Sequence, residues 1–120
     1  MSSKMNGLNK SAMALNGAIE RWDNKPSRWC KGHFAEDAHG GAIYSTNERA
    51  VAWCAMGAVE VSVARELLDD NWVDNHIDAM LGFRWADNGT ALWNDSPGRT
   101  FEEVRDRFTA YFGLCAVQGG

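Results

Sequence analysis

Proline, cysteine and long apolar runs are all scarce in this sequence of 120 residues, which has two prolines and three cysteines. Three widely spaced cysteines give no closed disulfide framework, so we expect a reducing compartment. The first ten residues lack the apolar segment of a secretion signal. No apolar run reaches the roughly 18 residues of a membrane-spanning helix. We therefore expect a cytoplasmic protein with no membrane partner.

Positive charge is also in short supply, with 12 Lys and Arg against 16 Asp and Glu and a net charge of -4. Such a chain is a poor candidate for general nucleic-acid binding or for docking on anionic lipid. A hydrophobic share of 45% predicts one folded domain over residues 1–120, with frayed ends at about 1–4 and 117–120. Tryptophan is unusually frequent for a chain of this length, with six occurrences.

Apolar residues recur at helical spacing in four segments. The predicted helices span residues 5–22, 45–68, 72–82 and 101–115, and the second and fourth open with the capping boxes Ser45–Glu48 and Thr100–Glu103. Alternating valines at 59, 61 and 63 are typical of a strand, but length and alanine content favour a helix there. The sequence thus predicts an all-α fold, one compact domain of about four helices with ordered loops at 27–47 and 84–99. The apolar stripe of the first helix also allows a homo-oligomer.

The most specific candidate site directly precedes the last predicted helix. It is the stretch Trp93-Asn94-Asp95-Ser96-Pro97-Gly98-Arg99-Thr100. Backbone N–H groups at a helix start favour anions, Arg99 offers a planar fork for phosphate or carboxylate, and Trp93 offers a stacking face. The alternative is a local turn, in which Asp95 caps the turn and pairs with Arg99.

Two further candidate sites stand out. In the first loop, Arg28 and Trp29 could hold a planar charged ligand, or Trp29 could fill the core with Arg28 lying over it. Glu60 lies in an otherwise apolar segment, where a carboxylate must be paired, hydrogen-bonded or protonated. Arg28 or Arg99 could be its partner.

Metal binding and nucleophilic catalysis have less support from spacing. Four zinc-type ligands occur at Cys30, His33, His39 and Cys54. Their spacing fits no standard zinc finger. A nucleophilic mechanism would use Cys30 with His33, or His76 with Asp74 or Asp78, and no motif fixes that geometry. We therefore expect no metal ligands and no cofactor.

Three segments together resemble a known group of proteins. They are Trp29-Cys30-Lys31-Gly32 followed by Asp37 and Gly40, Trp53-Cys54-Ala55-Met56-Gly57-Ala58, and the W-N-D-x-P-G-R-T stretch from Trp93 to Thr100. Over about residues 10–112 the chain is similar to small proteins of bacteria and their phages that carry a domain-of-unknown-function label. The resemblance implies no activity, only the positions that define the group: Trp29, Asp37, Trp53, Trp93, Asn94, Asp95, Arg99 and Thr100.

These features predict a small non-enzymatic protein that binds an anionic, nucleotide-like ligand. The expected binding residues are Arg28, Trp29, Glu60, Trp93, Asn94, Asp95, Arg99 and Thr100. The likeness to phage proteins suggests sequestration of a host signalling nucleotide. One alternative is a protein–protein interaction module or an inhibitor of a host factor, because Trp and Arg are common interface anchors. A second is a small hydrolase or lyase that uses Glu60 and Arg99.

Overall fold

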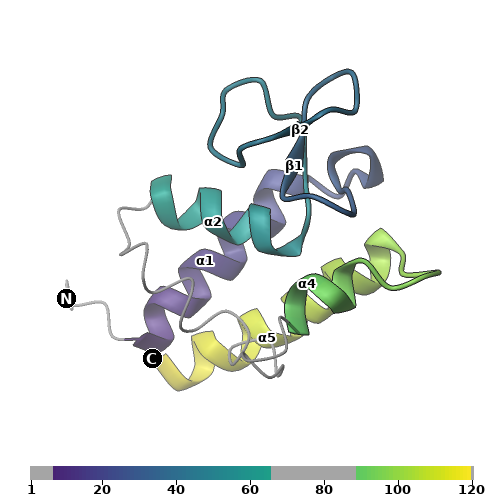
Figure 1. Cartoon of the computed structure of the whole chain (residues 1–120). Coiled ribbons are helices and arrows are strands. Elements are labelled where there is room, and N and C mark those ends of the chain that lie inside the picture. Colours follow the sequence, from purple (N-terminus) through teal and green to yellow (C-terminus); the bar gives the residue numbers. More distant parts are fainter. Residues whose placement is uncertain (1–6, 66–88, 120) are drawn as a thin grey trace.

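The computed structural model describes residues 7–65 and 89–119 of the chain (Figure 1). Its helices are α1 (Gly7–Trp22), α2 (Ala55–Arg65), α4 (Gly89–Asn94) and α5 (Phe101–Gly119), with a 3-10 turn η1 (Pro26–Arg28). Its strands are β1 (Ala35–Glu36), β2 (Ala42–Ile43) and β3 (Ala52–Trp53). The helix predicted over 72–82 lies outside the described residues.

The all-α prediction is wrong, because the structure contains a three-stranded antiparallel sheet in the order β2-β1-β3. Ala35 of β1 pairs with Ile43 on one side and with Trp53 on the other. Two of these strands lie in the segment predicted as the first loop. The third lies in the segment predicted as the start of the second helix. The fold is therefore mixed α/β.

The helix predicted from Ser45 begins instead at Ala55. Residues 44–50 form consecutive turns, in which the Asn47 N–H donates to the Tyr44 carbonyl at 3.0 Å. The Val51 N–H then donates to the Glu36 carbonyl at 2.8 Å, which draws the chain onto β1. Pairing with a strand distant in sequence thus overrides the local capping-box pattern. Helix α4 is a second correction, since residues 84–99 were predicted as a loop.

Helix α1 agrees with the prediction from periodicity and lies between α2 and α5 (Figure 1). Its last residue, Trp22, is fully buried, with its ring centroid 5.0 Å from Phe108 and 5.8 Å from Phe101. The Trp22 indole N–H donates to the Trp53 carbonyl at 2.9 Å. One side chain therefore joins the helical core to the sheet. No helix within the described ranges is long and apolar enough to span a membrane.

Helix α2 touches the sheet segment closely at Gly57. A Cβ atom at this position would overlap the carbonyl oxygen of Phe34. Glycine is therefore required by the close approach of two backbones. Gly113, in α5, is a useful contrast, since a Cβ there would meet no heavy atom within 4 Å among the described residues.

We expect Gly57→Ala to lower the free energy of unfolding by at least about 2 kcal/mol, because the overlap is with backbone and cannot be relieved by a rotamer change. Gly113→Ala should raise it by about 0.5–1 kcal/mol, the difference in helix propensity. Urea denaturation of both variants measures the contrast. Equal stability of Gly57→Ala and the wild type would show that α2 and the Phe34 segment do not approach in this way.

Candidate functional site

Asn94, the last residue of α4, is fully buried and joins three segments of the chain. Its Oδ1 accepts from the Trp29 indole N–H at 2.7 Å and from the Ala55 N–H at 3.0 Å. Its Nδ2 donates to the Cys30 carbonyl at 3.1 Å and to Asp95 Oδ1 at 2.9 Å. The side-chain amide therefore uses both donors and accepts two bonds. One of them satisfies an N–H in the first turn of α2, which has no partner within the helix.

Two more hydrogen bonds join the segment that follows Cys30 to the residues that follow Asn94. The Gly32 N–H donates to Asp95 Oδ1 at 3.0 Å, and Lys31 Nζ donates to the Ser96 carbonyl at 2.9 Å. Gly32 has a φ of +85°, which a residue with a Cβ rarely adopts. The W-C-K-G segment and the W-N-D segment, far apart in sequence, thus form one continuous structure, which we call the Asn94 junction. The sequence predicted that Trp29, Asn94 and Asp95 bind a ligand. In the structure, these residues make the hydrogen bonds that join the two segments.

Two guanidinium groups lie against the ring of Trp93. The Arg99 guanidinium lies 4.4 Å from the ring centroid of Trp93, and the Arg107 guanidinium lies 5.3 Å from the same ring. Arg99 Nε also donates to the Trp93 carbonyl at 2.9 Å. Arg107 further contacts the Tyr111 ring at 5.6 Å. Arg107 did not emerge from the sequence, although its four-residue spacing from Glu103 and Tyr111 places the three on one helix face.

The capping box at the start of α5 is confirmed. The Thr100 N–H donates to Glu103 Oε1 at 2.9 Å, and the Glu103 N–H donates to Thr100 Oγ1 at 3.2 Å. The first of these bonds, helped by Arg99 at 3.5 Å, lowers the pKa of Glu103 from its ordinary value. Two of the N–H groups expected to receive an anion are therefore occupied by the chain's own side chains. Arg99 pairs with Glu103 and not, as the local-turn interpretation had it, with Asp95.

Arg28 and Glu60 lie apart from this arrangement. Arg28 Nε donates to the Arg21 carbonyl at 2.7 Å, and its guanidinium lies 5.5 Å from the ring centroid of Trp53. Glu60 accepts a hydrogen bond from Ser45 Oγ at 2.9 Å. Within the described residues, the structure brings neither Arg28 nor Arg99 into an ion pair with Glu60.

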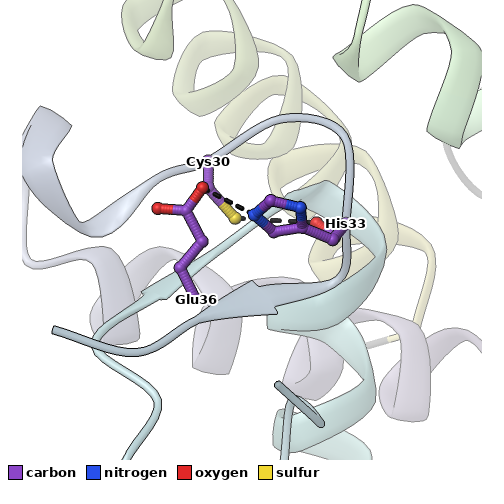
Figure 2. A group of neighbouring side chains, drawn as sticks. All are labelled: Cys30, His33 and Glu36. Carbon is purple, nitrogen blue, oxygen red and sulfur yellow. Dashed lines mark hydrogen bonds and ion pairs between the residues drawn. The ribbon is translucent and has the colours of Figure 1, made fainter. Parts of the chain in front are cut away.

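A compact cluster of possible metal ligands adjoins Asn94, because the carbonyl of one of its members, Cys30, accepts from the Asn94 amide. Figure 2 shows the cluster. It consists of Cys30, His33 and Glu36, whose ligand atoms all lie within 4.8 Å of one another. His33 Nε2 lies 2.6 Å from Glu36 Oε2, and Cys30 Sγ donates to the His33 carbonyl at 3.6 Å. Sequence reasoning missed Glu36. His39 lies instead in the exposed turn around Asp37, where its backbone N–H donates to the Asp37 carboxylate.

The two cysteines of the described chain are buried, free thiols. The pKa of Cys30 is raised to about 12, mainly by burial. The nearby Cys54, Glu36 and Asp95 raise this pKa further in the same direction. Burial likewise raises the pKa of Cys54 to about 11. Because the thiolate is the nucleophile, this environment does not activate Cys30 for attack. The other residues considered for catalysis, His76 with Asp74 or Asp78, lie outside the described residues.

A family model described as a family of unknown function, DUF6197, matches residues 19–111. No curated protein and no solved structure matches the chain. The matched region covers well over half of the sequence, so the chain belongs to DUF6197. The site motifs all fall inside the matched region.

We expect Asn94→Asp to lower the free energy of unfolding by on the order of 3 kcal/mol, because the change removes two donors from a buried network and places charge beside Asp95. Asn47→Asp is the matched control. Asn47 Oδ1 accepts from the Arg49 N–H at 2.8 Å, and an aspartate side chain can accept the same bond. Chemical denaturation compares the two, and similar losses in both variants would contradict the role of the Asn94 donors.

The capping box predicts a pH dependence. Because the folded pKa of Glu103 is lowered, its ionised form stabilises the fold above the ordinary pKa of 4.5, and this stability is lost as pH falls through the folded pKa. Glu103→Gln should therefore be less stable than wild type at pH 7, with the difference vanishing in strong acid. The control is Glu102→Gln, since Glu102 takes no part in the capping box. Thermal melts at several pH values give the result, and a pH-independent difference would refute it.

Proposed function

We propose that this member of DUF6197 is a binding protein whose ligand presents a phosphate-like group to a surface formed by Trp93, Arg99, Arg107 and Tyr111. We call this the Arg99–Arg107 surface. The observation that carries the proposal is the placement of two guanidinium groups within 5.3 Å of the same indole. Each guanidinium is a planar fork of N–H donors suited to phosphate or carboxylate.

Charge supports this choice of ligand. The chain as a whole carries a net charge of -4, so two arginines on one tryptophan run against its general balance. Glu103 compensates part of this charge from 3.5 Å, but its side chain is half exposed and its pairing is screened by water. An anion bound at either guanidinium would add charge-assisted hydrogen bonds.

The ligand we favour is a nucleotide derivative, because it combines phosphate with an aromatic base. Trp93 already contacts both arginines, so a base would stack more readily on the half-buried ring of Tyr111. From the resemblance of its motifs to those of bacterial and phage proteins, we further propose a phage origin and sequestration of a host signalling nucleotide. A hydrolase or lyase that uses Glu60 with Arg99 has less support, since these two residues have separate partners.

A protein–protein interaction module is the second candidate, and exposed apolar side chains favour it. Tyr44 is 84% exposed, Leu92 63% and Phe34 45%. Phe34 and Tyr44 flank the paired residues Ala35 and Ile43, so they lie at the same end of the sheet. The four tryptophans within the described ranges are buried or half-buried, so the anchors of such an interface would be Tyr44 and Phe34.

The test is native mass spectrometry of gently purified protein, before and after addition of mononucleotides, cyclic nucleotides and cyclic dinucleotides. We expect a discrete nucleotide adduct, whose affinity by calorimetry falls about tenfold or more in Arg107→Ala. Arg105→Ala is the control, because Arg105 lies on the same helix but bonds to Asn24 and Asp106.

Equal loss of affinity in the two arginine variants would move the site away from the Arg99–Arg107 surface. No uptake of any nucleotide would overturn the ligand class. A stable complex with another protein that is weakened by Tyr44→Ala would then support the interaction module.

A further inference from the structure

We propose that Cys30, His33 and Glu36 form a zinc site, separate from the Arg99–Arg107 surface. A thiolate, an imidazole nitrogen and a carboxylate oxygen are the three ligand types that Zn²⁺ takes from proteins. Here one atom of each type lies within 4.8 Å of the other two (Figure 2). This ligand set differs from the four zinc-type residues that the sequence analysis considered. It includes Glu36, and His39 lies instead in a separate exposed turn.

The backbone holds the three ligands in place. Cys30 precedes the turn that contains His33, and Glu36 lies in β1. The Cys30 N–H donates to the Trp53 carbonyl at 3.4 Å, and the Cys54 N–H donates to the Phe34 carbonyl at 3.1 Å. The last residue of β3 and the residue after it therefore hold the chain on both sides of His33. The Asn94 amide holds the Cys30 carbonyl as well. Ligands positioned in this way need little reorganisation to bind a metal ion.

The orientation of His33 distinguishes a ligand set from a catalytic triad. In a triad, one ring nitrogen faces the nucleophile and the other faces the acid. Here Nε2, the nitrogen that contacts Glu36, is on the same side of the ring as the Cys30 sulfur (Figure 2). All three groups therefore converge on one point. A divalent cation at that point would receive one thiolate, one carboxylate and one neutral imidazole, which leaves the site electrically neutral.

Access and coordination number also fit. The His33 and Glu36 side chains are 31% and 28% exposed, so an ion can reach the cluster from solvent. A cavity of about 60 Å³ borders the cluster at His33 and is lined by Gly32, His33, Phe34, Cys54, Ala91 and Asp95. This volume accommodates water. Three protein ligands with water in the fourth position is the arrangement of zinc sites that remain open to a further ligand. On binding, the Zn–S bond forms as Cys30 releases its proton to solvent.

The experiment uses the full chain after treatment with EDTA and dialysis. Titration with Zn²⁺ should give a stoichiometry of one and a rise in melting temperature, and Co²⁺ should give a thiolate-to-metal absorption band in the near ultraviolet. His33→Gln and Glu36→Gln should each weaken Zn²⁺ binding at least about tenfold. Loss of a residue that only hydrogen-bonds to a metal ligand already lowers metal affinity by about that factor. His39→Gln, the control, should bind as the wild type does.

Cys30 lies at the Asn94 junction, so Cys30→Ser could disturb folding. The two more exposed ligands, His33 and Glu36, therefore carry the test, with circular dichroism as a check on the fold. Binding of Zn²⁺ weaker than about 10 μM would overturn the proposal. Equal losses of Zn²⁺ affinity in His33→Gln and His39→Gln would also overturn it. So would a loss of Zn²⁺ affinity in Cys54→Ser together with unchanged affinity in Glu36→Gln. None of these outcomes depends on nucleotide binding.

Discussion

The buried side-chain amide of Asn94 holds together the parts of the molecule where both proposed sites lie. Its bonds reach Trp29, Cys30 and Ala55, and through them the first loop, the sheet and the start of α2. A buried donor or acceptor that loses its partner costs more than the bond itself contributes. The arrangement is therefore all-or-none: the proposed zinc ligands on one side and Trp93 with its arginines on the other are positioned together. We regard Asn94 as a structural residue that makes the neighbouring chemistry possible.

Local patterns in the sequence predicted α1 and α5 well, and they failed where the structure depends on distant pairing. The apolar stripe that ends before Pro26 and the Thr100–Glu103 capping box both act within a few residues, so a single sequence reveals them. The strands are only two residues long and carry no visible alternation. The capping pattern at Ser45 is equally good on local grounds, but the bond from Val51 to Glu36 outweighs it.

The candidate site shows the same limit. The W-N-D-x-P-G-R-T stretch was singled out as a candidate site, but its role as the partner of the Trp29–Cys30 segment spans more than 60 residues of sequence. Glu36 was missed because the conformation of a turn, and not a known spacing, brings it to His33. Arg107 was missed because nothing local indicates that α5 lies against Trp93. Side chains that meet across the fold become visible only in three dimensions.

The bonds of Asn94 also bear on the order in which the protein assembles. They connect residues 39, 64 and 65 positions apart, so they form only after long loops have closed. The entropy of closing such loops is lost before the contacts compensate for it, which delays non-local structure during folding. Helical turns form locally and early, whereas the junction of the Trp29 and Trp93 segments belongs to the final steps of folding. A chain emerging from the ribosome can therefore form the Asn94 junction only after the residues of α4 have been synthesised, and the Arg99–Arg107 surface only after those of α5.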